Sequence, residues 1–353
     1  MIRGPSPIES GSALLAERIA RAPDELQELL ETEAPSGSLH GPGPVITTGA
    51  GASEGPARVL AATLRAGGTP ARFEPLSAFA SERERTRMVA TNAELVLVSQ
   101  SLSPNARLAL RRASLFRAFT VVTSVSPDAH APPLSAPALL ATAANAGARI
   151  VTHGPKEEPG LLVRVLGPVS ATLAVLRLAG ATPPGELVER YRKSYELGKT
   201  RSEALGLSCG EHPGGGAQTI AFLTAGSGAS FAHGHRWKLL EACAAADPPV
   251  WDVLQFAHGP FQQIYERPML LLGLERLGDE PLFERFYSLL VPDRHRFLRV
   301  QATLPEPWSF FEHDAQLNAL ALTLLALRPR DLMSWPGQGA DGPLYDFTGD
   351  DDT

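Results

Sequence analysis

Residues 45–68 read VITTGAGASEGPARVLAATLRAGG, and residues 220–246 read IAFLTAGSGASFAHGHRWKLLEACAAA. Each stretch is a short apolar run, then a loop ending in Gly-Ala-Ser, then a segment whose apolar residues recur at helical spacing. The matching glycines, Gly51 and Gly228, stand half the chain apart. Because self-similarity at a long period indicates a duplicated structural unit, we predict two similar α/β domains.

Short apolar runs alternate with helical patterns through the rest of both halves. Strands of a parallel sheet are buried on both faces and alternate with helices, so these runs predict parallel strands. Besides the two runs quoted above, the predicted strands are residues 71–74, 94–99, 119–123, 149–152, 250–254, 269–272 and 297–301. The predicted helices are a pair over 13–30 interrupted at Pro23, then 105–113, 173–205 with a break at Pro183-Pro184, and 315–328.

The predicted fold class is α/β, with two tandem, doubly wound, three-layer α/β/α domains built on parallel sheets. A chain of 353 residues, 44% hydrophobic, can bury two such cores. The predicted division is a helical lead-in (1–36), a first domain (37–180), a helical linker (181–215), a second domain (216–345) and an acidic tail (346–353).

Composition excludes several functional classes. A net charge of −6 without a basic footprint argues against nucleic acid as a partner. Cys209 and Cys243 are the only cysteines, too few for a disulfide framework. No apolar run approaches the roughly 18 residues of a membrane span, and the first ten residues lack the apolar core of a signal peptide. We therefore expect a cytoplasmic protein with no membrane partner.

A serine-rich loop follows the predicted strand 94–99. Ser99, Gln100, Ser101 and Ser103 offer hydroxyl and amide donors. Gly51 and Ser53 lie in the loop that follows the neighbouring strand. The carboxyl ends of parallel strands lie at one edge of the sheet, where ligands collect and helix N-termini favour anions. These two loops predict a phosphate-binding site.

Two alternative roles for these loops stay open. Serine and asparagine before a helix are ordinary helix caps. The glycines also suggest a dinucleotide site, although Gly55 falls one place late for the G-x-G-x-x-G motif. The acidic residue that such a site needs at the end of the next strand would have to be Glu74.

A second group of chemically capable residues lies in the other half. Lys238 and Glu241 share one face of the predicted helix, and His258 follows in a Gly-Pro turn. A carboxylate and an imidazole suffice for an aldose–ketose shift, in which one opens the sugar ring and the other moves a proton between C1 and C2. The alternatives are a surface Lys–Glu pair, or a metal site of His233, His235 and His258. The metal site is disfavoured because histidines two residues apart diverge on a helix.

These motifs together resemble the sugar isomerase (SIS) family. In layout the chain is similar to the isomerase half of glutamine–fructose-6-phosphate aminotransferase. Residues 94–101 (ELVLVSQS) resemble the family's Ser-Gln-Ser phosphate loop, and 49–53 (GAGAS) resemble its Gly-Thr-Ser loop. Residues 238–241 (KLLE) resemble K-L-K-E, 257–260 (AHGP) resemble K-H-G-P, and Ile19 with Pro23 matches the family's lead-in.

The resemblance implies roles for the residues that match. Glu241 would carry the proton between C1 and C2, and Lys238 would hold the open-chain sugar. His258 would open the ring, reaching the site of a partner subunit in a homodimer. The resemblance implies a sugar phosphate or related polyol as the ligand. It implies neither a metal nor a cofactor.

The chain also departs from the family pattern. Residues 102–104 (LSP) replace G-E-T, Ala52 replaces a threonine, and no S-T-K follows the segment 154–157 (GPKE). Gly234 replaces an acid, and the family's C-terminal lysine has no counterpart. No glutaminase domain accompanies these motifs, so glutamine is not the expected nitrogen source.

Three functions remain open from the sequence. The first is an aldose–ketose isomerase, or an isomerising deaminase or deglycase, acting on a sugar phosphate or amino-sugar phosphate. The second is a non-catalytic sugar-phosphate sensor. The third is altered chemistry around His233 and His235, with Trp237 and Trp251 stacking on a bulkier ligand, although core packing is the simpler role of those tryptophans.

Overall fold

The computed structural model describes residues 6–33, 39, 43–89, 92–155, 158–206, 219–243, 247–266, 269–291 and 295–348. The chain divides into two compact units. The first-sheet unit comprises residues 24–159, 166–182 and 335–353, and the second-sheet unit comprises 1–23, 160–165 and 183–334. The first five residues, the end of the predicted linker from 207, and the predicted tail from 349 lie outside the described residues.

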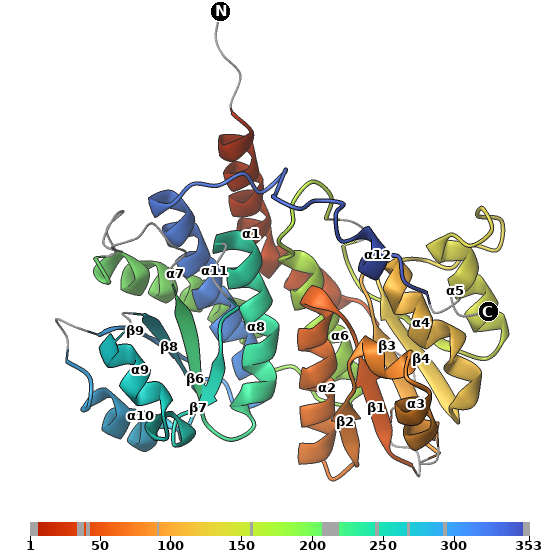
Figure 1. Ribbon diagram of the computed structural model, residues 1–353, viewed down its shortest axis with the longest axis horizontal. Coiled ribbons are helices and arrows are strands. Elements are labelled where there is room, and N and C mark those ends of the chain that lie inside the picture. The colour runs from red at the N-terminus through yellow and green to blue at the C-terminus, as the bar shows by residue number, and fades with distance from the viewer. Residues whose placement is uncertain are drawn as a thin grey trace, which may run out of the picture. The chain divides into compact units, whose positions relative to one another are not determined.

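The first-sheet unit is built on five parallel strands in the order β2-β1-β3-β4-β5. They are β1 (Val45–Thr48), β2 (Ala71–Phe73), β3 (Glu94–Val98), β4 (Ala118–Thr123) and β5 (Arg149–Thr152) (Figure 1). Along β3, Leu95 and Leu97 pack into one core cluster while Val96 and Val98 pack into another. Helices on both faces bury this sheet, which explains its continuous apolar runs.

The helices of this unit alternate with its strands. The α-helices are α2 (Glu54–Ala66), α3 (Glu82–Val89), α4 (Arg107–Arg111), α5 (Ala136–Asn145), α6 (Leu166–Leu178) and α12 (Gly342–Tyr345). The 3-10 turns are η1 (Gly51–Ser53), η2 (Leu76–Phe79), η3 (Pro104–Ala106) and η4 (Ala113–Leu115). The helix predicted over 105–113 is therefore wrong in form, because the chain makes three short pieces between β3 and β4. Pieces this short carry little helical dipole.

The second-sheet unit repeats the same topology with four parallel strands in the order β7-β6-β8-β9. They are β6 (Ile220–Thr224), β7 (Val250–Asp252), β8 (Leu270–Glu275) and β9 (Arg296–Gln301). The helical elements are α7 (Leu187–Ala204), α8 (Gly228–Cys243), η5 (Gln255–Ala257), α9 (Pro260–Glu266), α10 (Glu280–Tyr287) and α11 (Ser309–Leu327). The order matches β2-β1-β3-β4, so the predicted duplication and fold class are confirmed.

The long helix α1 (Pro7–Glu31) corrects one prediction. The sequence predicted a helix pair broken at Pro23, but Pro23 lies inside one continuous helix. Proline removes one backbone hydrogen bond and costs about 3 kcal/mol in a helix interior. Burial of Leu15, Ile19 and Leu26 on this helix offsets that cost.

Helices α7 and α11 pack unusually closely within the second-sheet unit. A Cβ added at Gly198 would lie 2.5 Å from the Cα atom of Gln316, so only glycine permits this approach. Because the contact fixes the rotation of α7 about its axis, it also decides which α7 side chains face the ends of β8 and β9. No helix among the described residues combines the length and apolarity that a bilayer crossing requires.

Candidate functional site

The loop after β3 is tied to the loop after β4 in the first-sheet unit. The carbonyl oxygen of Gln100 accepts hydrogen bonds from Ser124 N (3.0 Å), Ser124 Oγ (2.8 Å) and Thr123 Oγ1 (3.0 Å). Ser99 is buried, and its N–H donates to the carbonyl of Val122. These bonds hold Ser99 and Gln100 at the carboxyl edge of the sheet, where the sequence predicted the phosphate site.

Leu102 holds this loop in a strained conformation. Its φ is 50°, in the left-handed region that branched residues avoid, and its side chain is 1% exposed. The N–H groups of Ser101, Leu102 and Ser103 donate to no acceptor in the part of the chain described. Successive unpaired N–H groups around a left-handed residue are a typical anion-binding arrangement. An anion at this loop would therefore be bound by loop N–H groups rather than by the dipole of the short helix that follows.

The loop of residues 49–53 lies against the end of β3. A Cβ on Gly49 would come within 2.9 Å of the Val98 carbonyl oxygen, so the two predicted phosphate loops are neighbours. Gly51 adopts φ 54°, a conformation suited to glycine. Ser53 stands at the N-cap of α2 but makes no capping bond with its side chain. Likewise, the Ser103 hydroxyl donates to Asn105 Oδ1 (2.8 Å) and makes no capping bond. The helix-cap interpretation of these two serines is therefore wrong.

Glu158, which the sequence analysis did not single out, connects the loop to the first turn of α6. Its buried carboxylate accepts from the N–H groups of Leu166 (2.9 Å) and Gly167 (2.7 Å), capping α6, and from Gln100 Nε2 (3.4 Å). Local capping rules could not find it, because the acceptor lies eight residues before its helix rather than at the N-cap. The predicted segment 154–157 is adjacent, but residues 156 and 157 lie outside the described residues.

Glu74 does not serve the dinucleotide alternative. Its carboxylate is buried and accepts from Arg72 Nε (2.7 Å) and Arg87 Nη2 (3.0 Å). A carboxylate engaged by two guanidinium groups is poorly suited to bind a ribose hydroxyl as well. Gly55, the third glycine of that motif, lies inside α2.

Lys238 points into the second-sheet unit. It is 6% exposed, and its Nζ donates to Asp314 Oδ1 of α11 at 2.6 Å. The other Asp314 oxygen accepts from Tyr191 Oη (2.9 Å) and Asn318 Nδ2 (3.1 Å). Lys238 is thus the charged partner of a hydrogen-bonded network that joins α7, α8 and α11.

The pKa values of this network follow from its burial and charges. Burial by itself raises the pKa of Asp314, but the Lys238 ammonium and the His235 ring lower it more, leaving the carboxyl below its ordinary value. Burial lowers the pKa of His235, whose Nδ1 lies 3.7 Å from Asp314, too far for a hydrogen bond. Burial, with a smaller effect of His235, lowers the pKa of His313 to about 3. Asp314 is therefore charged and the two histidines are neutral near pH 7.

Glu241 and His258 are not brought together within their unit. Glu241 is half-buried near the end of α8, and His258 is exposed after η5. No hydrogen bond or ion pair among the described residues joins them. The phosphate loops belong to the other unit, so the joint site of loops, carboxylate and imidazole stays a prediction.

The metal and aromatic alternatives find little support in the second-sheet unit. His235 stacks on Phe310 with ring centroids 4.5 Å apart, as a core side chain does. No cluster of three His, Cys, Asp or Glu side chains suited to a metal occurs in the described ranges. Trp251 packs against Phe256 at 5.5 Å, which agrees with core packing. Arg236 lies over the Trp237 ring at 5.4 Å.

The two tandem parallel α/β units define the fold of SIS-domain proteins, and solved structures of that fold align with nearly the whole chain. Glucosamine-6-phosphate deaminase from Thermotoga maritima aligns at TM-score 0.66 and 13% identity, covering 90% of this chain and 96% of that one. The C-terminal domain of glucosamine-fructose-6-phosphate aminotransferase from Francisella tularensis aligns at 0.62 and 11%, covering 89% and 96%. Tagatose-6-phosphate ketose/aldose isomerase from Escherichia coli aligns at 0.62 and 16%, covering 93% and 95%.

The likeness is one of structure. No protein-family model and no curated protein sequence matches this chain. Identities of 11–16% establish the shared fold and leave the activity to be argued from the site.

Proposed function

We propose that this chain binds a sugar phosphate, or an amino-sugar phosphate, at residues 99–103 together with Gly51 and Ser53. One observation carries the proposal: Leu102 is held at φ 50° while the three N–H groups around it have no acceptor among the described residues. Phosphate oxygens are the acceptors that such a loop suits. The proteins of like fold that are named for sugar phosphates support the same ligand class.

The proposed chemistry is an aldose–ketose shift or the related deamination. The Glu241 carboxylate would take the proton from C2 of the open-chain sugar and return it to C1, while His258 moves the proton that opens the ring. With an amino-sugar, the same proton transfer would give an imine at C2, which water would hydrolyse to the ketone with release of ammonia. Lys238 would hold the open-chain form. In a homodimer, His258 would come from the partner subunit.

Two measurements test binding and catalysis separately. Binding of fructose 6-phosphate by calorimetry should weaken about tenfold or more in Ser101→Ala, because a charge-assisted hydrogen bond is lost. Ser114→Ala is the matched control, an exposed serine in η4, which precedes β4 at the opposite edge of the sheet. Equal affinities of the two variants would contradict the site.

Catalysis is tested by deuterium exchange at C2 of candidate sugar phosphates in deuterated water. Glu241→Gln should abolish exchange while leaving phosphate affinity unchanged. Exchange at the wild-type rate in Glu241→Gln would remove this carboxylate from the mechanism.

A second candidate, a sugar-phosphate sensor without catalysis, is favoured by one specific observation. Lys238 is engaged in a buried ion pair with Asp314, and His258 makes no bond to Glu241. A sensor should bind sugar phosphates tightly with no C2 exchange and no ammonia release across a broad panel. Turnover of any member of the panel would exclude it.

A further inference from the structure

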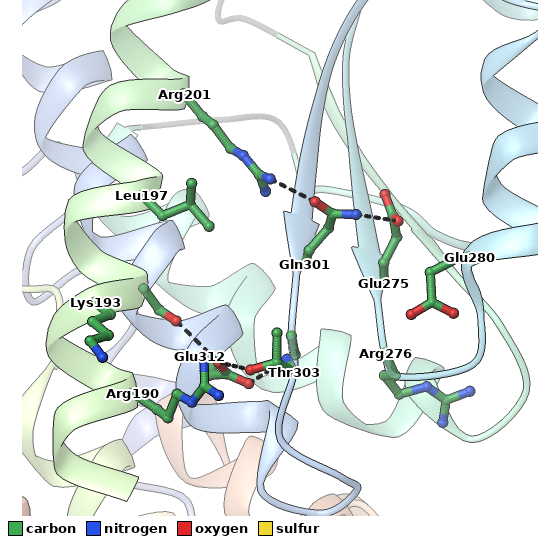
Figure 2. A pocket seen from close by; sticks show the side chains of 12 residues that line it. Arg190, Lys193, Leu197, Arg201, Glu275, Arg276, Glu280, Gln301, Thr303 and Glu312 are labelled. Carbon is green, nitrogen blue, oxygen red and sulfur yellow. Dashed lines mark hydrogen bonds between the residues drawn. The ribbon is translucent and has the colours of Figure 1, made fainter. Parts of the chain in front are cut away.

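The second-sheet unit contains a pocket of about 340 Å³ that none of the functions above uses. It lies at the carboxyl ends of β8 and β9, beside α7, where open parallel sheets bind ligands (Figure 2). Its volume falls within the range of about 300–1,000 Å³ typical of small-molecule sites. Position and size therefore both suit a ligand.

One face of α7 gives the pocket an unusual wall. Arg190, Ser194, Leu197 and Arg201 follow helical spacing on one side of α7, and Figure 2 shows the two arginines reaching toward the strands. A helix beside a sheet normally presents an apolar stripe. The Gly198 contact with α11 holds this polar stripe in place. The wall is therefore a fixed feature of the packing.

The buried acids of the pocket already have hydrogen-bond donors within the same unit. The Glu275 carboxylate accepts both Nη2 (2.7 Å) and Nε (2.8 Å) of Arg299. The Glu312 carboxylate accepts from the N–H groups of Thr303 (2.7 Å) and Leu304 (2.6 Å). Both carboxylates are therefore held by donors other than the arginines on α7.

Neither Arg190 nor Arg201 on α7 forms an ion pair with a carboxylate among the described residues, although the charge of Glu275 acts on Arg201 from a distance. Arg201 donates to three neutral oxygens, the Arg299 carbonyl (2.7 Å), Gln301 Oε1 (2.6 Å) and Gln316 Oε1 (3.5 Å). Arg190 is half-buried and has no ion-pair or hydrogen-bond partner for its side chain among the described residues. Two guanidinium groups that face one pocket and have no ion-paired carboxylate in the described ranges favour an anion, and their planar forks match carboxylate and phosphate oxygens.

The opposite rim favours hydroxyl groups. Glu280 is half-buried there, and its Oε2 accepts only a backbone N–H, from Gly278 (2.9 Å). Its remaining lone pairs can accept hydrogen bonds from ligand hydroxyls. A ligand that is anionic at one end and hydroxylated at the other fits both rims.

We propose that this pocket binds a small polyhydroxylated anion, a sugar or polyol bearing a phosphate or carboxylate, independently of the loop at residues 99–103. Arg190 and Arg201 bind the anionic group, and Glu280 accepts from the hydroxyls. The site adds a second ligand position to the chain, on the second sheet.

Calorimetry on the full chain tests the pocket with four probes: inorganic phosphate, glucose 6-phosphate, gluconate and neutral sorbitol. Arg190→Ala should weaken binding of the anionic probes about tenfold or more, and sorbitol should bind no better than buffer. Lys199→Ala, which removes an exposed cation elsewhere on α7, should leave affinity within about twofold. Glucose 6-phosphate and gluconate distinguish a phosphate from a carboxylate as the preferred group.

The two proposed sites are separated by crossing the variants. Ser101→Ala should weaken binding only at the first site. The binding that Arg190→Ala weakens should therefore persist in Ser101→Ala. Arg190→Gln is a second variant that keeps a polar but uncharged side chain, and thermal unfolding confirms that both variants are folded. The proposal is overturned if no anionic probe shows binding that depends on Arg190, or if Lys199→Ala weakens binding equally.

Discussion

Replacing Lys238 with methionine tests whether this lysine stabilises the fold or is reserved for a ligand. The substitution keeps most of the aliphatic stem but leaves the Asp314 carboxylate without the ammonium at 2.6 Å. Removing one partner of a buried ion pair costs about 3–5 kcal/mol. Because Tyr191 and Asn318 still donate to Asp314, we expect a loss near the lower end, about 3 kcal/mol.

The loss should depend on pH through His235. In the wild type, burial and, to a smaller extent, the Lys238 ammonium lower the pKa of this ring, while Asp314 raises it. Without the ammonium the folded-state pKa rises, so protonated His235 can supply the missing positive charge. A group whose folded pKa is raised stabilises the fold at low pH and loses that effect as pH rises through the folded value. The loss should therefore be smaller at pH 5.5 than at pH 8.

Urea unfolding followed by tryptophan fluorescence is the assay. Trp237, Trp251 and Trp308 lie in the second-sheet unit and only Trp335 lies in the other, so the signal reports mainly the unit that is perturbed. Lys199→Met is the control and should change stability by less than about 0.5 kcal/mol. A loss below about 1 kcal/mol, or one independent of pH, would refute the structural role and leave Lys238 available for substrate.

Three further changes test other parts of the packing. Gly198→Ala should lower the free energy of urea unfolding by about 2–3 kcal/mol, because the added Cβ meets the Gln316 backbone. Gly185→Ala, whose Cβ would enter open space, should change it by almost nothing. Equal effects would contradict the close packing. His313, whose folded-state pKa is about 3, should lower the free energy of unfolding by about 1.4 kcal/mol per pH unit as pH drops below about 6.5. His313→Gln should reduce that slope, and an unchanged slope would refute the contribution of His313. Glu158→Ala should cost about 2 kcal/mol and speed hydrogen exchange at the first amides of α6, and unchanged exchange would exclude the cap.

The strands were predictable because their residues alone determine them. Runs such as 94–98 and 220–224 are apolar on both faces, which only a sheet covered on both sides satisfies. The repeated Gly-Ala-Ser loop then indicated the duplication.

The helices α1 and α11 were harder, because tertiary packing decides them. Pro23 breaks a helix in isolation, but the buried stripe of α1 holds it together. Helix α11 begins at Ser309, six residues before its predicted start, because Glu312 and Asp314 are buried with partners on other elements. No local pattern shows that a buried acid will find such partners.

The same distinction applies to the candidate site. The loop of residues 99–103 could be predicted because its donors are contiguous and directly follow a strand. Glu158 and Asp314 could not, since each acts through a partner that is far away in the sequence or outside any capping motif. Likewise, the pocket beside α7 joins Arg190 to Glu280 across a distance in sequence that no motif spans.

The two sheets place different chemistry at the same topological position. Strands β3 and β8 occupy equivalent places in the two sheets, yet β3 continues into a neutral serine-rich loop in which the N–H groups of Ser101–Ser103 meet no acceptor among the described residues, whereas β8 ends in Glu275 and continues into Arg276. Glu275 is engaged by Arg299, and Arg276 by Asp279, so the loop after β8 is neutralised by its own unit. Under the two proposals, an anion on the second sheet would be bound from α7, which lines the pocket, while an anion on the first sheet would be bound by the loop itself. The duplication preserved the strand topology, and the side chains at the strand ends determine separately in each unit which element offers positive charge or N–H groups.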